Sequence, residues 1–383
     1  MPKVVITGMG LWTPLGEGII SNWNGFSQPC LLPLGEGGRR PDEGHYPATS
    51  LAEAAAKEAL QDAGLWDGER LTGVDPYRFG CTVSASKPLL TPAVVPPEVV
   101  NDFLRQRFGL EGECRNVIAA CATGAYAIAL AGSWIEEGLC DVVLAGSVEA
   151  YPHPLIEAGF RRMGVVTPES VMRPFDQRRS GFTFGAGAGI VVLESEKHFR
   201  QRDEYRISNI EKVPFRNTKS DIRPYAVLSG WGLGSDPHSA VAFNSNGRHI
   251  AGVIQRACRR GGIEPQAIRH VNAHGTATRH NDVIETQALQ AAFGAHAGKL
   301  CISATKSHTG HLLGAAGSVE LIFTVLALHH QFIPPTAHWK EPDPDCPLDY
   351  TPNVGHPERF DHALSLSFGF GGPIGALLVS SPS

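Results

Sequence analysis

Hydrophobic residues along the chain fall into short unbroken runs that alternate with segments of helical period. The first run, residues 3–8, predicts a buried strand, and residues 49–64 carry apolar side chains at helical spacing and close on a glycine. The pattern then predicts a strand at 78–85, a helix near 97–108, a strand and helix at 116–135 and a strand at 140–147. This order is typical of an α/β fold with a largely parallel, buried sheet.

The second half of the chain repeats this pattern. Its predicted elements, in the same order, are a strand at 225–232, a helix at 250–262, a strand at 269–276, and a strand at 300–306 that leads to a helix at 312–330. We therefore predict a duplicated α/β unit with halves 1–224 and 225–383. Because sites in such sheets form beyond the carboxyl ends of strands, Cys121, His274 and Lys306 are expected to face one pocket.

Composition narrows the class of protein. The chain has 383 residues, of which 42% are hydrophobic and 19% charged, as in a globular protein. A net charge of −5 without a basic cluster argues against nucleic-acid binding. The first apolar run is too short for a signal peptide, and no stretch is expected to approach bilayer-spanning length. We expect a cytoplasmic protein without a membrane partner.

The chain has eight cysteines, and no two of them form a C-x-x-C pair, so neither a disulfide framework nor a zinc site is indicated. Cys121 stands apart because it lies where an apolar run turns into an alanine-rich helix. The positive end of a helix and its free N–H groups favour a thiolate there, as expected of a nucleophile. The alternative is a buried structural cysteine, because cysteine is among the residue types most often buried.

Four strings resemble those of the β-ketoacyl-acyl-carrier-protein synthases, condensing enzymes of the thiolase-like superfamily, and agree with them in order. They lie around Cys121 and at residues 271–278, 305–317 and 367–372. The resemblance implies a thiolase-like duplicated αβαβα five-layer fold. It also implies decarboxylative condensation of an acyl group held on cysteine with malonyl-acyl carrier protein, in fatty-acid or type II polyketide or polyene biosynthesis.

The resemblance assigns roles to individual residues. Cys121 would be the nucleophile that takes the acyl group, and the backbone N–H groups of Cys121 and Phe370 would form the oxyanion hole. His274 and His311 would face the malonyl thioester and stabilise the enolate left by decarboxylation. Neutral imidazoles suit this task because each can donate an Nε2–H to a developing oxyanion.

Two charged residues would support the histidines. The resemblance implies that Lys306 holds His311 in its working tautomer or tunes the local charge, and that Glu320 ties to Lys306. The alternatives are a solvated lysine at a strand end and a plain charge on a helix face. Asp282 and Glu285 follow the first histidine string, and we interpret them as charges at a helix N-terminus.

The remaining implied contacts concern the substrate. Thr276 and Thr278 would hold the phosphopantetheine arm, or would only cap the turn after the strand. Phe370 would gate the entry of the extender unit, while Phe160 and Phe368 would contact the substrate. For Phe160, the alternative is a plain core residue.

Departures from the family concern the substrate and a cation. Leu366 replaces a usual asparagine, so we predict no metal, and no resident cofactor beyond the phosphopantetheine that carries the substrates on acyl carrier protein. The chain is shortened at 29–47 and between 208 and 249, which would reshape the acyl pocket. This leads to the hypothesis of a specialised polyketide or polyene ketosynthase.

The expected partners are acyl carrier protein and a second subunit, in a homodimer or in a heterodimer with a catalytically silent chain-length factor. Two other functions stay open. A non-catalytic chain-length-factor-like subunit would usually lack Cys121, and a non-decarboxylating thiolase would need a second cysteine in the string that holds Phe370. A synthase that starts chains from coenzyme A would show an asparagine in place of His311.

Overall fold

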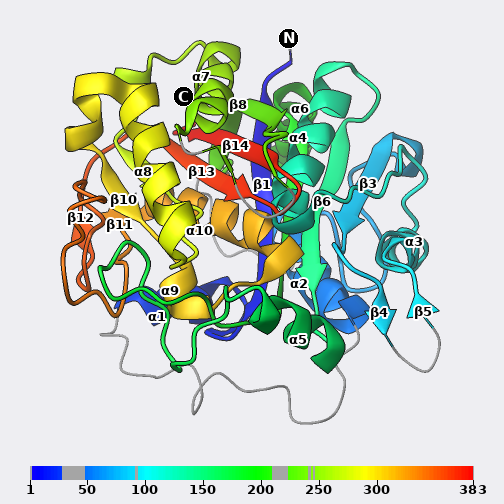
Figure 1. Ribbon diagram of the computed structural model, residues 1–383. Coiled ribbons are helices and arrows are strands. Elements are labelled where there is room, and N and C mark those ends of the chain that lie inside the picture. The colour runs from blue at the N-terminus through cyan, green and yellow to red at the C-terminus, as the bar shows by residue number, and fades with distance from the viewer. Residues whose placement is uncertain are drawn as a thin grey trace.

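The computed structural model describes residues 2–27, 48–90, 94–208, 223–239, 243–244 and 246–382. One mixed sheet has the strand order β10-β9-β13-β14-β8-β1-β7-β6-β3, with β2 attached to β1 (Figure 1). Its strands are β1 (Val4–Thr13), β2 (Gly16–Glu17), β3 (Phe79–Ser84), β6 (Val142–Glu149), β7 (Gly187–Ser195), β8 (Ala226–Ser235), β9 (His270–Asn272), β10 (Cys301–Ser303), β13 (His362–Phe368) and β14 (Pro373–Ser380).

Helices and two small strand pairs complete the described part of the chain. The helices are α1 (Ile19–Ser27), α2 (Ala48–Asp62), α3 (Glu98–Phe108), α4 (Thr123–Glu136), α5 (Pro154–Arg162), α6 (Glu196–Ser208), α7 (Arg248–Gly261), α8 (Arg279–Phe293), α9 (Lys306–Thr309) and α10 (Ala316–His330). The pairs are β4 (Leu89–Leu90) with β5 (Val94–Val95), and β11 (Phe332–Ile333) with β12 (His356–Pro357).

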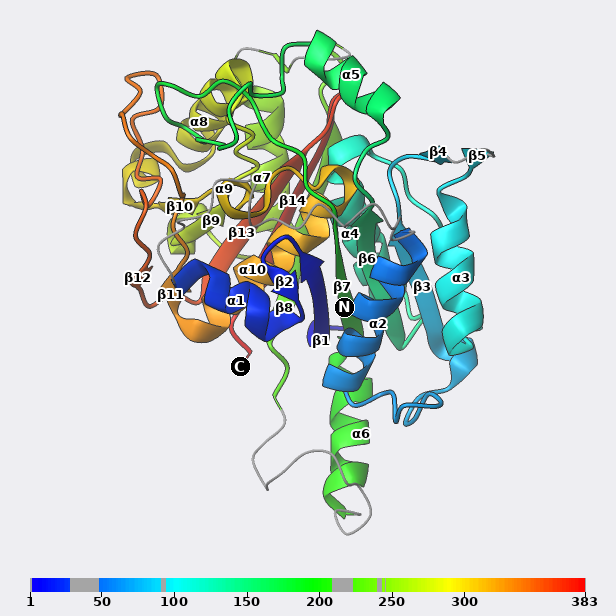
Figure 2. The ribbon, with the colours of Figure 1, turned by 90° about the horizontal axis from the view of Figure 1, so that it is seen from below.

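The elements form five layers, as the resemblance implied. Helices α2 and α3 cover one outer face, α7 and α8 cover the other, and α4 and α10 lie between the two halves of the sheet (Figure 2). Along β6, Val142 and Leu144 point into the core under α2 and α3, while Val143 and Ala145 point into the central core. A strand buried on both faces needs apolar residues at successive positions, which explains the unbroken runs.

The prediction of a largely parallel sheet was wrong. Strands β3 and β6 are parallel, as are β9 with β10 and with β13, but β7 runs antiparallel to both β1 and β6. Strand β14 likewise runs antiparallel to β13 and β8. Strand β7 begins at the end of the sheet where β6 stops, and β14 begins where β13 stops. Each therefore runs antiparallel to the strand before it. Apolar runs look alike in both directions, so the pattern could not separate the two cases.

The apolar run before Cys121 is not a regular strand. The chain there pairs with β3 only at one bridge, between Cys114 and Cys81. It then enters a 3₁₀ turn, Ala120–Ala122, which leads directly into α4. The sequence therefore predicted the helix correctly and the strand incorrectly.

The two halves match down to single backbone angles. A second 3₁₀ turn, Leu313–Ala315, leads into α10 as Ala120–Ala122 leads into α4. Each turn begins with a non-glycine residue of positive φ, 48° at Ala120 and 50° at Leu313. Such angles are costly for L-residues and persist only where the surroundings impose them. The match makes Gly314 the counterpart of Cys121.

One described segment, Leu313–His330, is long and apolar enough to cross a membrane, so the expectation that no stretch approaches this length was wrong. It is 89% buried, as the middle helix of the five layers. The predicted short connection at 29–47 and part of the second shortened region lie outside the described residues. The division between residues 224 and 225 stays a prediction.

Candidate active site

Cys121 lies in the strained 3₁₀ turn at the start of α4 and is 7% exposed. The turn is held by Thr123, whose hydroxyl accepts from Ala119 N–H at 2.9 Å and donates to the carbonyl of Ala120 at 2.7 Å. The first N–H groups of a helical segment lack intrahelical acceptors, which leaves the Cys121 N–H available as a donor. The turn therefore presents the thiol and a free N–H together.

The turn between β13 and β14 passes directly beside this N–H. A Cβ placed on Gly369 would lie 3.0 Å from Cys121 N, so only glycine permits this close approach. Phe370 is the next residue, and its ring is 5.9 Å from that of Phe160. The placement agrees with an oxyanion hole shared by Cys121 and Phe370, and that role stays a prediction.

The ionisation expected for Cys121 is not supported. Burial raises the pKa of the Cys121 thiol, and the cations of Lys87 and Lys306 oppose this rise without overcoming it. The helix N-terminus is where the sequence placed it, but desolvation disfavours the thiolate more strongly than the nearby positive charges favour it. The structure therefore favours the neutral thiol of Cys121, and its role as the nucleophile stays a prediction.

The two histidines meet in one buried site, as predicted. His274 follows β9 and His311 follows α9, they are 4% and 2% exposed, and their rings lie 5.6 Å apart at 82°. Burial, together with the charge of Lys306, lowers the pKa of both imidazoles well below the usual value. Both rings are therefore neutral at physiological pH.

Hydrogen bonds fix the tautomer of each ring. The Lys306 ammonium lies 3.3 Å from His274 Nδ1, and the backbone N–H of Leu313 donates to His311 Nδ1 at 3.2 Å. An Nδ1 that accepts leaves the proton on Nε2 in a neutral imidazole. Two Nε2–H donors result, as the enolate-stabilising role requires.

Lys306 contacts the Nδ1 of His274 and not that of His311, while its charge lowers the pKa of both imidazoles, as the second predicted role has it. Its Nζ contacts His274 Nδ1 and donates to the His274 carbonyl at 2.5 Å, while the Nδ1 of His311 is held by Leu313. The sequence could not show this, because Lys306 and His311 are neighbours along the chain whereas His274 reaches Lys306 only through the pairing of β9 with β10. The alternative of a solvated lysine is excluded, since Lys306 is 0% exposed.

The predicted tie between Glu320 and Lys306 is confirmed. Glu320 Oε1 lies 2.5 Å from Lys306 Nζ, and both side chains are buried. Burial raises the pKa of Glu320 to about 7, against the opposing pull of Lys306. Its second oxygen has no hydrogen-bond partner within the described part of the chain. The part of this pair in catalysis stays a prediction.

Asp282 and Glu285 are support residues that the sequence interpretation missed. Glu285 accepts from the N–H groups of His274 at 2.7 Å and Gly275 at 2.8 Å, and Asp282 accepts from Phe175 N–H at 2.7 Å. Both are fully buried; Asp282 lies in the first turn of α8, as interpreted, whereas Glu285 lies one turn further along the helix. Their spacing of three residues on α8, which puts both on one helix face, was the available signal.

Glu285 predicts a pH dependence of stability. Burial raises the pKa of Glu285 to about 8, so between pH 5 and 8 the folded chain binds a proton that the unfolded chain releases. Stability should then fall with rising pH, at a slope of up to about 1.4 kcal/mol per pH unit from this group. Thermal unfolding of Glu285→Gln should show a flatter profile than the wild type between pH 5.5 and 8.

Glu194 is the matched control for that experiment. It is buried like Glu285, but bonds from His198 and Arg202 outweigh burial and lower its pKa. Glu194 is thus ionised in both states above pH 5.5, and Glu194→Gln should keep the wild-type slope. An unchanged slope in Glu285→Gln would refute the assignment.

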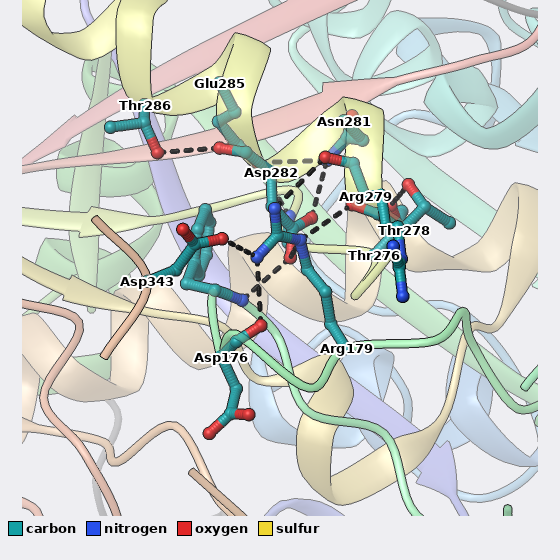
Figure 3. A network of polar contacts seen from close by, with 12 residues as sticks. Asp176, Arg179, Thr276, Thr278, Arg279, Asn281, Asp282, Glu285, Thr286 and Asp343 are labelled. Carbon is teal, nitrogen blue, oxygen red and sulfur yellow. Dashed lines mark hydrogen bonds and ion pairs between the residues drawn. The ribbon is translucent and has the colours of Figure 1, made fainter. Parts of the chain in front are cut away.

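A buried arginine fixes the turn that carries the two threonines (Figure 3). Arg179 donates to the carbonyls of Thr278 at 3.2 Å and Arg279 at 3.1 Å, and it forms an ion pair with Asp343. The hydroxyls of Thr276 and Thr278 lie 2.9 Å apart. Thr278 is the N-cap residue of α8 but makes no capping bond with its side chain, so capping by this hydroxyl is not supported, and binding of a phosphopantetheine arm stays a prediction.

A cluster of aromatic rings contacts His311 through Phe182. Phe182 lies 4.9 Å from the His311 ring, and Phe160 contacts Phe182, Phe184 and Phe370. Phe160, on α5, is half-buried and packs against the core cluster of Met172, Phe182 and Ala277, so the structure agrees with the core alternative and its contact with substrate stays a prediction.

Phe368 is fully buried, 5.1 Å from the His274 ring. A fully buried Phe368 ring is better placed to support the His274 imidazole than to make the contact with substrate that the resemblance implied. Among the described residues there is also no group of three or more His, Cys, Asp or Glu side chains that could hold a metal ion.

A buried cysteine, two neutral imidazoles with fixed Nε2–H donors and a duplicated five-layer fold define a condensing enzyme of the thiolase-like class. Family models described as "Beta-ketoacyl synthase, N-terminal domain" and "Beta-ketoacyl synthase, C-terminal domain" match residues 40–198 and 225–340. A Streptomyces cyaneus protein named as a polyketide beta-ketoacyl synthase 1 is 36% identical over 304 residues, covering 78% of this chain and 68% of that protein. The chain belongs to the β-ketoacyl synthase family.

Further relatives agree over the full length. The mitochondrial 3-oxoacyl-acyl-carrier-protein synthase of Arabidopsis thaliana is 31% identical, with 99% of this chain and 93% of that protein covered. A type II polyketide acyl carrier protein in complex with its ketosynthase, AntDE:AntF, matches at a TM-score of 0.85 and 26% identity. The ishigamide ketosynthase/chain length factor matches at 0.82 and 27%, and both comparisons cover 100% of each chain. The protein is therefore an acyltransferase that forms a carbon–carbon bond in fatty-acid or polyketide biosynthesis.

Proposed function

We propose that Cys121 accepts an acyl group from acyl carrier protein and that His274 and His311 decarboxylate malonyl-acyl carrier protein to extend it. The observation that carries this assignment is the pair of neutral imidazoles, 5.6 Å apart, whose Nδ1 atoms are both engaged. Two Nε2–H donors can converge on one thioester oxygen, where negative charge develops as carbon dioxide leaves.

The chemistry proceeds in two balanced steps. In the first, the Cys121 sulfur attacks the acyl thioester, the carrier leaves as a thiolate, and the cysteine proton passes to that thiolate. In the second, the malonyl thioester loses carbon dioxide, its electron pair forms the enolate, and the enolate carbon attacks the acyl group. The Cys121 thiolate leaves and regains a proton, which yields β-ketoacyl-acyl carrier protein and free enzyme.

Intact-mass analysis tests the first step. Wild-type protein incubated with acyl-acyl carrier protein should gain the mass of one acyl group, and addition of malonyl-acyl carrier protein should discharge it. Cys121→Ala should gain no adduct. An adduct on that variant would place the nucleophile elsewhere, and the absence of any adduct on the wild type would refute the enzymatic assignment.

We further propose that the chain works in the cytoplasm as the catalytic subunit of a type II polyketide or polyene system, paired with a chain-length factor. Similarity to the ishigamide ketosynthase/chain length factor and to a polyketide synthase of Streptomyces supports this. Native mass spectrometry after co-expression with the related subunit should show a heterodimer. A stable homodimer that extends ordinary saturated acyl carriers at full efficiency would contradict it.

A further inference from the structure

Glu149, at the end of β6, makes contacts in the second half of the site that the function above does not use. Its Oε2 accepts from Gly314 N–H at 3.1 Å and from Ser86 N–H at 3.3 Å, and the Ser86 hydroxyl also donates to it. The Lys87 ammonium lies 3.6 Å away. All four contacts meet on one oxygen of a side chain that is 7% exposed.

The duplication of the chain shows which residue of the second half corresponds to Glu149. Glycines 124 and 317 occupy matching positions in α4 and α10, and a Cβ on either would lie within 2.7 Å of the backbone nitrogen of the other helix, at Ser318 and Ala125. Ser147 of β6 lies beside the first glycine and Ser367 of β13 beside the second. Ser147 in β6 and Ser367 in β13 are therefore counterparts. Glu149 and Gly369, each two residues further along the chain, are counterparts as well.

Gly369 lies against Cys121 N–H, and Glu149 lies against Gly314 N–H, the counterpart of Cys121. Both N–H groups stand at the first turn of a helical segment, after a residue of positive φ. Beside Cys121, glycine leaves that N–H free for a reacting oxygen. Beside Gly314, a carboxylate oxygen already occupies the equivalent place.

The contact between Glu149 and Gly314 is linked to His311 by one residue, Leu313. Leu313 precedes Gly314, has a φ of 50°, and donates its N–H to His311 Nδ1. A strained residue keeps its backbone angle only while its neighbours hold it. The bond from Gly314 to Glu149 anchors the turn on one side, so the direction of the Leu313 N–H depends on it.

We propose that Glu149 is a positioning residue for His311. Its carboxylate fills the second-half counterpart of the oxyanion position, holds the Leu313–Ala315 turn in its strained form and thereby fixes the Nε2–H tautomer of His311, while Lys87 balances its charge. The proposal rests on the proposed function, in which His311 acts on the malonyl thioester.

The experiment compares two rates in Glu149→Ala and Glu149→Gln: decarboxylation of malonyl-acyl carrier protein, and alkylation of Cys121 by iodoacetamide. In Glu149→Ala the rate constant for decarboxylation should fall by about 10- to 100-fold with KM unchanged, as for a lost bond to a charged acceptor. Glu149→Gln keeps an amide oxygen for Gly314 and should recover much of this rate. Alkylation should be as fast as in the wild type or faster in both, because Glu149 raises the pKa of Cys121.

Glu194→Gln serves as the buried-carboxylate control and should change neither rate. Decarboxylation by Glu149→Ala within threefold of the wild type would overturn the proposal. A parallel loss of alkylation would also overturn it, because a general structural role would explain both changes. Failure of the proposed function itself is recognised separately, since wild-type protein would then release no carbon dioxide.

Discussion

Replacing Lys306 by methionine is expected to lower the free energy of unfolding at pH 8 by about 3–5 kcal/mol, because Glu320, whose pKa burial already raises to about 7, loses its cation and must stay charged or take up a proton. Decarboxylation should be lost as well, since His274 Nδ1 loses the donor that fixes its tautomer. Chemical denaturation measures the first effect, and release of carbon dioxide from malonyl-acyl carrier protein measures the second.

A second variant separates the two effects. In Lys306→Met combined with Glu320→Gln, no buried charge remains unpaired, so much of the lost stability should return. Decarboxylation should not return, because the donor to His274 is still missing. If the double variant regained both stability and decarboxylation, Lys306 would act only through the ion pair, and its proposed support of His274 would be wrong.

Replacing His274 by alanine should lower the decarboxylation rate by about 100- to 1000-fold, the usual cost of one oxyanion donor. Transfer of an acyl group onto Cys121 should continue, because that step uses the other half of the site. Single-turnover assays of the two steps measure this difference.

His308 offers a matched control for that variant. It is buried in α9, three residues before His311, and its Nε2 bonds to the Pro335 carbonyl at 3.0 Å outside the candidate site. His308→Gln should decarboxylate at a rate close to that of the wild type. A similar loss in both variants would show that the effect of His274 is structural and not chemical.

The candidate site could be predicted largely because its reacting residues lie in short strings. His274 follows β9, Cys121 lies in the turn that leads into α4, and His311 precedes the matching turn that leads into α10. Their supporting contacts could not be predicted in the same way. The partner of Lys306 depends on strand pairing, and pairing joins residues that are more than thirty positions apart.

Burial was the other quantity that the sequence did not reveal. Asp282 and Glu285 were interpreted only as charges at a helix N-terminus, yet both are fully buried, and Asp282 accepts a bond from the backbone N–H of Phe175. Burial also reversed the expected ionisation of Cys121, since desolvation of the thiolate exceeded the attraction of the nearby cations. In the fold, strand direction was missed because a strand that is apolar on both faces, such as β6, has the same pattern in a parallel and in an antiparallel pair.

The central claim is a division of labour, in which Cys121 holds the acyl group and the second half of the chain decarboxylates the extender. Conversion of malonyl-acyl carrier protein to acetyl-acyl carrier protein by Cys121→Ala, followed by mass spectrometry of the carrier, tests it most directly. The account predicts that this variant produces acetyl-acyl carrier protein, and that Cys121→Ala combined with His274→Ala does not. The claim would be contradicted if Cys121→Ala left malonyl-acyl carrier protein unchanged.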